Sequence, residues 1–163
     1  MFLSEAGRRI VSSSPWLHPR VRQRLLRAIG VRLGRGTFLS PPAVFKGKDV
    51  TTGSGCYINS GVYVGRGSLS LGSNVAVGPG VTFVTDTHEF GPSARRAGKN
   101  IKQPIVVGDG VWIGASAVIL GNVTIAPGCV IGAGTLVTKD TEPDGLYLGT
   151  PARRVRDLPA AGE

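Results

Sequence analysis

Residues 107–140 read VGDGVWIGASAVILGNVTIAPGCVIGAGTLVTKD and repeat with a period of six. The first position of each block is aliphatic, the second is in most blocks glycine or alanine, and the fifth is small or β-branched. This period fits neither an amphipathic helix nor a long alternating strand. It predicts short strands joined by tight turns, in which three blocks close one triangular coil and stacked coils bury an aliphatic column. The first positions are Val107, Ile113, Ile119, Ile125, Ile131 and Val137.

The same phase continues toward the N-terminus. Leu71, Val77 and Phe83 lead three further blocks. An earlier stretch has five residues spaced six apart, followed by a slip of three residues before Leu71, and we interpret the five as inward-facing positions. They are Phe38, Val44, Val50, Cys56 and Val62. The two cysteines, Cys56 and Cys129, fall on inward positions of the repeat, where we expect small buried apolar residues.

Composition excludes several classes of protein. The chain has 163 residues, enough for one domain, with 25 glycines but only 6% aromatic and 18% charged residues. It is therefore neither a coiled coil nor a charged disordered chain. Two cysteines are too few for a disulfide-rich secreted scaffold. Neither a signal peptide nor an apolar run of about 20 residues is present, so we expect a cytoplasmic protein.

The charge is concentrated in residues 1–35, which hold eight arginines and one acid, Glu5. We interpret 1–35 as a basic leader, 36–158 as the repeat domain and 159–163 as a tail. Within the leader, the spacing predicts a short amphipathic helix over about 19–29, ended by Gly30. Its apolar stripe comprises Val21, Leu25, Leu26 and Ile29, surrounded by Arg20, Arg22, Arg24 and Arg27.

Two roles remain open for this basic helix. Nucleic-acid binding is disfavoured because the arginines are not interleaved with aromatic residues and no recognition motif is present. The helix could associate weakly with an anionic membrane surface. It could instead pack on the first coil and cover its exposed strand edge. We favour the second role.

Residues 89–104 interrupt the repeat. They carry no aliphatic phase, yet Phe83 and Val107 lie 24 positions apart, a whole number of blocks. This predicts a loop without secondary structure, extruded from an intact solenoid. Its four cations face a single acid, Glu89, and fit either a solvated loop or contact with an acidic or phosphorylated acceptor. They are Arg95, Arg96, Lys99 and Lys102.

The chain has two histidines. His18 lies in the leader between Leu17 and Pro19, where a surface position is the simplest interpretation. His88 ends the block TDTH, where the regular wall gives way to the interruption. A wall that ends beside an extruded segment forms a cleft edge, and histidine is the side chain that most readily exchanges a proton near neutral pH. His88 is therefore the candidate catalytic residue.

Five motifs occur in an order and at spacings that resemble the hexapeptide-class sugar O-acetyltransferases, which include galactoside, maltose and nodulation acetyltransferases. The motifs are CYINSG, TDTHEF, GDGVWIGASAVIL, VIGAGTLVTKD and GTPARRVRDL. The resemblance runs from about Phe45 to Leu158. It implies an all-β fold, the left-handed parallel β-helix, and supplies the handedness that the spacing alone cannot.

The resemblance also implies a chemistry. His88 would be the general base that removes the proton from a saccharide hydroxyl as this oxygen attacks the thioester of acetyl-CoA directly, in a ternary complex. The backbone N–H of Ala115 would stabilise the oxyanion. Asn59 would bind the acceptor hydroxyl across a subunit boundary, so the implied assembly is a homotrimer with sites between subunits. The implied coenzyme A contacts are Trp112, Ala133, Thr138, Lys139, Arg153 and Arg156.

Alternatives remain at this point. The same base could serve an amine or an antibiotic hydroxyl, and a non-catalytic scaffold could use the same fold. A metal enzyme like the γ-type carbonic anhydrases needs three histidine ligands in each chain, whereas this chain has two histidines. We therefore expect no metal. The leader is shorter and more basic than that of the galactoside and maltose enzymes, which favours a role in polysaccharide or oligosaccharide biosynthesis.

Overall fold

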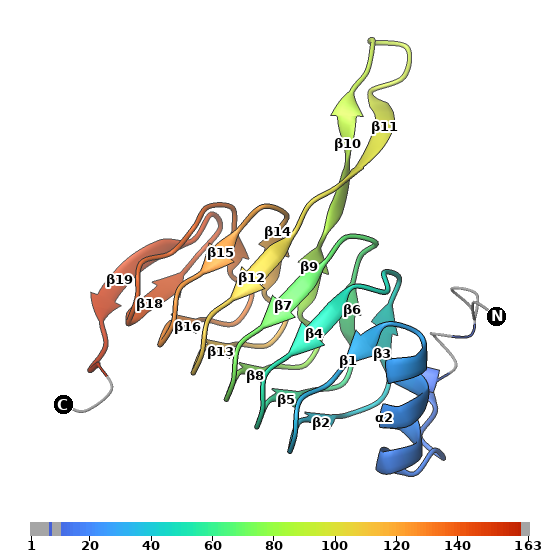
Figure 1. The fold of residues 1–163 in the computed structure, drawn as a ribbon. Helices are drawn as coiled ribbons and strands as arrows, with labels where there is room; N and C mark the ends of the chain where they lie inside the picture. The colour runs from blue at the N-terminus through green and yellow to red at the C-terminus, as the bar shows by residue number, and fades with distance from the viewer. Residues whose placement is uncertain (1–6, 8–10, 161–163) are drawn as a thin grey trace.

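The computed structural model describes Gly7 and residues 11–160, and within them the chain forms a parallel β-solenoid (Figure 1). Three short strands make each turn, and each strand pairs in parallel with the equivalent strand of the next turn. The predicted all-β repeat fold with a short N-terminal helix is confirmed. Parts of the predicted leader and tail, residues 1–6, 8–10 and 161–163, lie outside the described residues.

The solenoid is a prism with three faces, which we call sheets A, B and C. Sheet A consists of β1 (Val31–Arg32), β4 (Val50–Thr52), β7 (Leu69–Leu71), β12 (Ile105–Val107) and β15 (Thr124–Ile125). Sheet B consists of β2 (Phe38–Leu39), β5 (Tyr57–Ile58), β8 (Ala76–Val77), β13 (Trp112–Ile113), β16 (Val130–Ile131), β18 (Gly145–Leu148) and β19 (Arg153–Asp157). Sheet C consists of β3 (Ala43–Phe45), β6 (Val62–Val64), β9 (Thr82–Val84), β14 (Val118–Leu120) and β17 (Leu136–Val137).

Apolar residues, most of them aliphatic, stack into continuous columns along the axis of the prism. Strand register aligns one buried residue per turn on each sheet, which excludes water from the interior and contributes about 1.5–3 kcal/mol for each large side chain buried. The column on sheet B is Leu39, Ile58, Val77, Ile113, Ile131 and Tyr147. The column on sheet C is Phe45, Val64, Phe83, Ile119 and Val137. Cys56 and Cys129 are buried free thiols.

The inward phase inferred for residues 38–62 is wrong in part. Phe38 is 45% exposed and Val44 lies on the outer side of its strand, whereas Leu39 and Phe45 are buried. The first turns contain one residue more than the later ones, because β1 pairs with β4 nineteen positions on and β13 pairs with β16 eighteen positions on. The extra residue lies at the edge between sheets C and A, so the six-residue phase slips by one position per turn.

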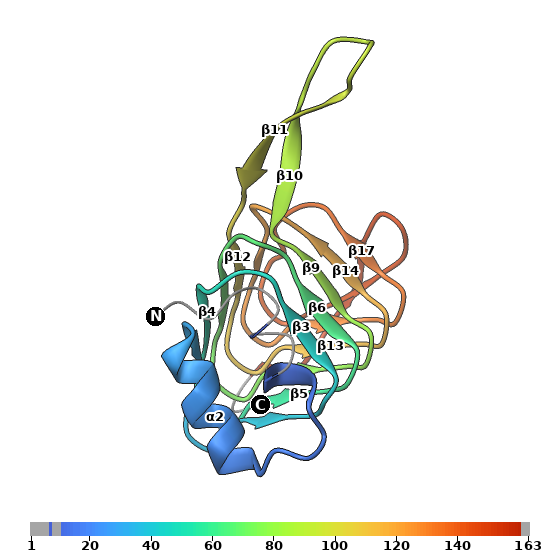
Figure 2. The same cartoon turned by 90° about the vertical axis from the view of Figure 1, so that its right-hand side faces the viewer.

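A β-hairpin leaves the prism at this same C/A edge, between β9 and β12 (Figures 1 and 2). It consists of β10 (Asp86–Phe90) and β11 (Ala97–Lys102), which pair in antiparallel fashion. The predicted extrusion of 89–104 from an intact solenoid is therefore correct, but the segment forms paired strands instead of a loop and begins at Asp86. Cross-strand backbone pairing, which a missing aliphatic phase cannot reveal, orders the segment.

The helix α2 (Pro19–Ala28) covers the N-terminal end of the prism. His18 caps it through Nδ1, which accepts a hydrogen bond from the Arg20 backbone N–H. Leu26 is fully buried, and the Arg22 guanidinium donates hydrogen bonds to the carbonyls of Leu39, Ser14 and Leu17. The helix therefore satisfies part of the open edge of β2, as the favoured packing role requires.

The polarity pattern of this helix differs from the prediction at two positions. Val21 is exposed, although it was placed in the apolar stripe. Arg22 is buried, although it was placed among the surrounding arginines. The burial of Arg22 is explained by the unpaired carbonyls at the start of the prism, because they need a hydrogen-bond donor that only a buried polar side chain can supply. Within the described part of the chain, every helix is too short or too polar to cross a membrane.

The C-terminal end closes with β18 and β19, which pair in antiparallel fashion. Arg154 joins the two strands, donating hydrogen bonds to the Tyr147 hydroxyl and to the carbonyls of Glu142 and Pro143, and forming an ion pair with Asp157. The Tyr147 hydroxyl and the Asp157 carboxylate hold the pKa of Arg154 above its ordinary value. The Arg154 guanidinium thus holds together the two strands that close the C-terminal end of the prism.

Candidate active site

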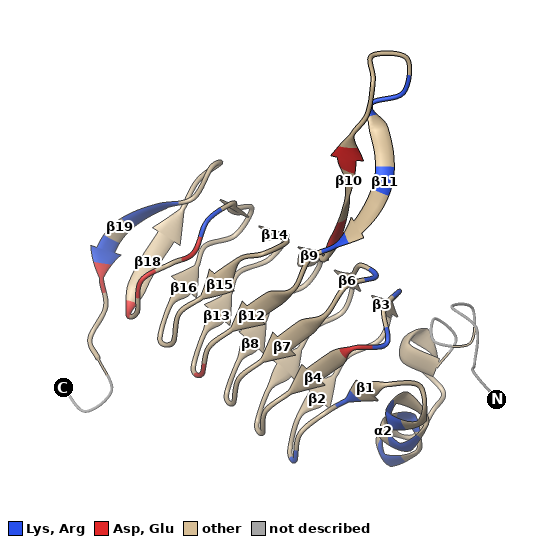
Figure 3. Ribbon diagram, turned by 45° about the horizontal axis from the view of Figure 1, so that its top comes forward, with Lys and Arg blue, Asp and Glu red and all other residues tan. Residues whose placement is uncertain are grey.

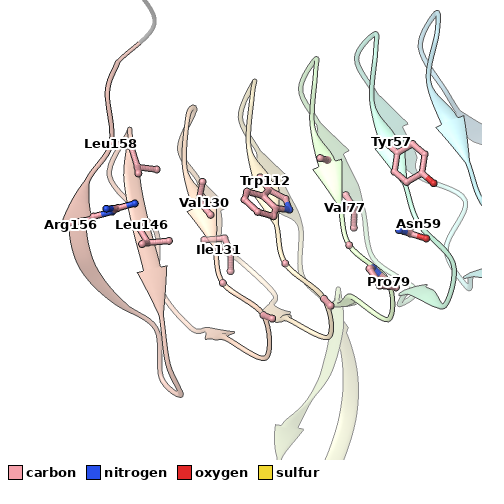
Figure 4. Close-up of a pocket in the computed structure, with 16 residues that line it drawn as sticks. Tyr57, Asn59, Val77, Pro79, Trp112, Val130, Ile131, Leu146, Arg156 and Leu158 are labelled. Carbon is pink, nitrogen blue, oxygen red and sulfur yellow. The ribbon is translucent and has the colours of Figure 1, made fainter. Parts of the chain in front are cut away.

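The outer face of sheet B carries a row of mostly apolar side chains with one member on each strand. Strand register aligns Phe38, Tyr57, Ala76, Trp112, Val130, Leu146 and Arg156. From Tyr57 to Arg156 this row lines a groove of about 800 Å³ (Figure 4). Trp112 lies in the middle of it and is 58% exposed. The groove is long, mostly apolar and ends at a cation, Arg156.

Bare backbone forms the side of the groove at the edge between sheets B and C. Gly78, Gly114 and Gly132 occupy equivalent positions in successive turns. A Cβ atom at Gly78 would lie 2.8 Å from the Ala115 nitrogen, and one at Gly114 would lie 2.6 Å from the Ala133 nitrogen. Glycine therefore leaves both N–H groups uncovered. Within residues 11–160, neither N–H donates a hydrogen bond.

Asn59 lies on this B/C edge one turn before Gly78 and lines the groove. Its Oδ1 accepts a hydrogen bond from the Ser60 backbone N–H at 2.8 Å, which fixes the side chain in the turn. The structure thus brings five of the predicted site residues into one groove. They are Asn59, Trp112, Ala115, Ala133 and Arg156.

His88 lies elsewhere, on β10 of the hairpin, with its imidazole exposed to solvent. Nδ1 lies 2.9 Å from the carbonyl oxygen of Gly98 on β11. Because a carbonyl only accepts, Nδ1 carries the hydrogen in this contact. In the neutral imidazole Nε2 then holds the lone pair, so the hairpin presents a base at Nε2. Glu89, the next residue along β10, is likewise exposed.

The hairpin and the groove lie on different parts of the prism. The hairpin of β10 and β11, which carries His88, leaves the prism at the C/A edge, opposite sheet B, whereas the groove follows sheet B and its edge with sheet C (Figures 1 and 4). His88 is accordingly not among the residues that line the groove. One protomer therefore does not unite the predicted base with Asn59 and Ala115.

Three further predicted residues also lie outside the groove. Thr138 and Lys139 are exposed and follow β17 directly, at the C/A edge that carries the hairpin. Arg153 begins β19, is exposed, and donates a hydrogen bond to the Ala152 carbonyl. The C/A edge thus holds His88, Thr138 and Lys139, while the groove holds the remaining predicted residues apart from Arg153.

Sequence reasoning missed several lining residues, chiefly Tyr57, Val130 and Leu146. The signal for Val130 was present, because it lies eighteen positions after Trp112 and so occupies the same outward place one turn on. Tyr57 follows from the nineteen-residue spacing of the earlier turns, which the sequence did not disclose. Among residues 7 and 11–160, no three or more His, Cys, Asp or Glu side chains gather into a cluster that could hold a metal ion.

Comparison with known proteins agrees with this architecture. Residues 104–139 match the family model described as bacterial transferase hexapeptide (six repeats). A galactoside O-acetyltransferase from Lactococcus lactis is 35% identical over 145 residues, which are 85% of this chain and 70% of the relative. A hexapeptide-repeat acetyltransferase from Vibrio cholerae, solved with acetyl-coenzyme A, superposes with a TM-score of 0.83 at 34% identity, covering 95% of this chain and 85% of that one.

A galactoside acetyltransferase solved in complex with coenzyme A superposes with a TM-score of 0.84 at 29% identity, covering 94% of this chain and 78% of the other. Identity above 30% over more than two thirds of a relative, together with the shared solenoid, confirms the family resemblance seen in the five motifs. The chain therefore belongs to the hexapeptide-repeat acetyltransferases, the family of the galactoside O-acetyltransferases.

Proposed function

We propose that this enzyme transfers the acetyl group of acetyl-CoA to a hydroxyl of a saccharide acceptor. The observation that carries the proposal is a groove with an unpaired backbone N–H at Ala115, in a chain whose hairpin presents the basic Nε2 of His88. Two of the relatives named above are galactoside acetyltransferases, and two of the similar structures hold coenzyme A or its acetyl form. We also propose that the enzyme acts in the cytoplasm.

The groove suits the shape and charge of the donor. Its apolar row, with Trp112 at the centre, matches the slender pantetheine arm, because an indole offers a large planar apolar surface. Arg156 at the C-terminal end would contact the phosphates of the nucleotide, and the Ala133 N–H would bind a polar atom of the arm. Arg153, exposed on the same strand, would add a second cation near the phosphates.

The remaining residues reach the donor if copies of the prism stand side by side. Rotation about an axis parallel to the solenoid keeps each residue at its own level along that axis. The hairpin leaves between β9 and β12, close to the level of Trp112 and Ala115 in β13 and its turn. Lys139 follows β17, near the level of β18 and Arg156. The C/A edge of one copy, set against the groove of the next, would therefore bring His88 and Lys139 to opposite ends of one donor.

The outer face of sheet C supports such contact between copies. Its outward row is largely apolar and only half-buried in a single chain, as in a surface that a neighbour covers. The row comprises Val44, Tyr63, Thr82, Val118 and Leu136. We propose a homotrimer with three sites between subunits, because cyclic closure with one contact type repeats the pairing of edge and groove around the axis.

The reaction then follows from the assembled groups. Asn59 would hold the acceptor hydroxyl, and Nε2 of His88 would take its proton as the oxygen attacks the carbonyl carbon of the thioester. The Ala115 N–H would donate to the oxyanion of the tetrahedral intermediate. Collapse of this intermediate breaks the C–S bond, and the imidazolium returns the proton to the departing thiolate. The Gly98 carbonyl keeps Nδ1 protonated throughout and so keeps Nε2 as the base.

A screen with labelled acetyl-CoA over monosaccharides, oligosaccharides, polysaccharides and amines tests the acceptor class. Mild alkaline hydrolysis of the products distinguishes O-acetyl esters, which it cleaves, from N-acetyl amides, which it leaves intact. We expect alkali-labile O-acetyl esters on glycans, consistent with a role in polysaccharide or oligosaccharide biosynthesis. The His88→Ala variant serves as the blank. Alkali-stable label on amines alone would replace the saccharide by an amine or aminoglycoside acceptor. Hydrolysis without transfer to any acceptor in the screen would contradict the proposal.

A further inference from the structure

The N-terminal end of the prism is strongly cationic. Residues 11–48 contain no aspartate or glutamate, and they contain six arginines and two lysines. Figure 3 shows these cations on α2, on β1 and in the turns that follow. The cations are Arg20, Arg22, Arg24, Arg27, Arg32, Arg35, Lys46 and Lys48. Except for Arg22, all lie at least partly at the surface.

Three of these arginines share one face of α2. Arg20, Arg24 and Arg27 are spaced four and three positions apart, so they are neighbours on the helix surface. They are exposed, and together with Gln23 they line a hollow of about 240 Å³. The opposite side of the helix, with Arg22 and Leu26, packs on the prism. No ion pair among the described residues includes any of the three exposed guanidinium groups.

An exposed aromatic residue lies in the turn that leads into this helix. Trp16, in the turn that precedes α2, is 93% exposed, and Val21 on the first turn of the helix is 45% exposed. An indole so exposed costs free energy in water, whereas tryptophan is favoured at the headgroup level of membranes, where its apolar body and its N–H are both accommodated. Cations beside such an anchor are the residue types that attract anionic lipids.

We propose that Trp16 and the exposed face of α2 form a docking surface for membranes that contain anionic lipids. The arginines would contact lipid phosphates, and the indole would enter the interface beside them. Double-stranded nucleic acid is a poorer match, because it offers the arginines phosphates but gives the indole no apolar layer to enter. Docking at this end leaves the groove on sheet B free along its length. The inference is independent of the acetyl acceptor.

The test measures sedimentation of the full chain with vesicles of phosphatidylcholine, with and without phosphatidylglycerol. We expect binding that needs phosphatidylglycerol and weakens with salt. The triple variant Arg20→Glu, Arg24→Glu, Arg27→Glu should lower the partition coefficient at least ~100-fold, since each cation near an anionic surface contributes about fivefold. The matched control, Arg95→Glu with Arg96→Glu and Lys99→Glu on the hairpin, changes the net charge equally and should lower it less than ~10-fold.

A second measurement does not depend on the charge variants. In the Trp112→Phe background Trp16 is the sole tryptophan, and its emission should shift to the blue on binding anionic vesicles and be quenched by lipids brominated on their chains. The proposal would be overturned if the chain bound equally well to vesicles without phosphatidylglycerol. It would also be overturned if both triple variants lowered the partition coefficient by the same factor. Affinity for duplex DNA or inorganic phosphate equal to that for vesicles, without a blue shift, would assign the surface to soluble polyanions instead and would likewise overturn it.

Discussion

At the scale of single residues, the account depends first on His88. Its Nδ1 is engaged by the Gly98 carbonyl, and its Nε2 is exposed on a hairpin that makes no contribution to the core. We predict that His88→Ala lowers kcat by about 10²–10⁴-fold, the usual contribution of a positioned general base, and leaves the melting temperature unchanged. Steady-state kinetics with thermal unfolding checks both. Glu89→Ala is the control, because Glu89 is an exposed residue of the same strand.

Arg22 should contribute to the stability of the fold. Its guanidinium is buried and bonds to three carbonyls, at 3.2 Å to Leu39, 2.7 Å to Ser14 and 3.2 Å to Leu17. Arg22→Met removes these charge-assisted bonds, but it also removes the cost of burying a charged group. The net effect should be a free energy of unfolding lower by about 2 kcal/mol. Arg24→Met, on the exposed face of the same helix, should change it by less than about 0.5 kcal/mol. Chemical denaturation of both variants measures the difference, and equal stability would contradict the capping role.

These two residues also show what sequence can predict. His88 is a candidate base because of its place at the end of a repeat block and because of its motif, both of which are local features of the sequence. The burial of Arg22 could not be predicted in this way, because its partners belong to β2 and to the segment before the helix, and nothing in an arginine-rich stretch distinguishes the one guanidinium that meets open carbonyls. The contact between His88 and the Gly98 carbonyl could not be predicted either, because every residue has a backbone carbonyl and the sequence does not show which one accepts a hydrogen bond.

At the scale of elements, the hairpin is separable from the solenoid. The Gln103 N–H donates to the Thr85 carbonyl at 2.8 Å, which is the spacing of residues that flank a two-residue turn. Replacing Asp86–Lys102 by Asn-Gly should therefore keep the solenoid folded, with an unchanged circular dichroism spectrum and acetyl-CoA affinity within about threefold of the wild type, but abolish transfer. An unfolded product would show that the hairpin supports the fold; retained transfer would exclude it from catalysis.

The six-residue repeat predicts the inward positions correctly in the later turns of the solenoid but not in the earlier ones. Between Val107 and Val137 the strands of successive turns pair at a spacing of eighteen residues, so the first position of each block predicts the inward residue correctly. Before β8, a nineteenth residue in each turn moves Phe38 and Val44 outward, and the spacing of single letters cannot distinguish this from a uniform repeat. The hairpin was recognised as an interruption but not as strands, because its pairing is between polar residues on an exposed ribbon.

At the scale of the whole molecule, the groove and His88 lie on different sides of one prism, so the site that we propose needs a second copy of the chain. Sedimentation equilibrium should accordingly give about three times the chain mass of 16.9 kDa. A charged substitution on the apolar face of sheet C, Val118→Glu, should shift the protein toward single chains and reduce transfer in parallel. A monomeric wild-type enzyme with full activity would contradict this arrangement.

Mixing two inactive variants tests the shared site most directly. His88→Ala lacks the base but keeps the groove, whereas Asn59→Ala keeps the base but lacks the acceptor contact. Copurified after random assembly from equal amounts, the two chains should recover about a quarter of wild-type activity, because one site in four then combines an intact hairpin with an intact groove from its neighbour. If both functions resided in the same chain, every site would lack one of them, and the mixture would stay as inactive as its components.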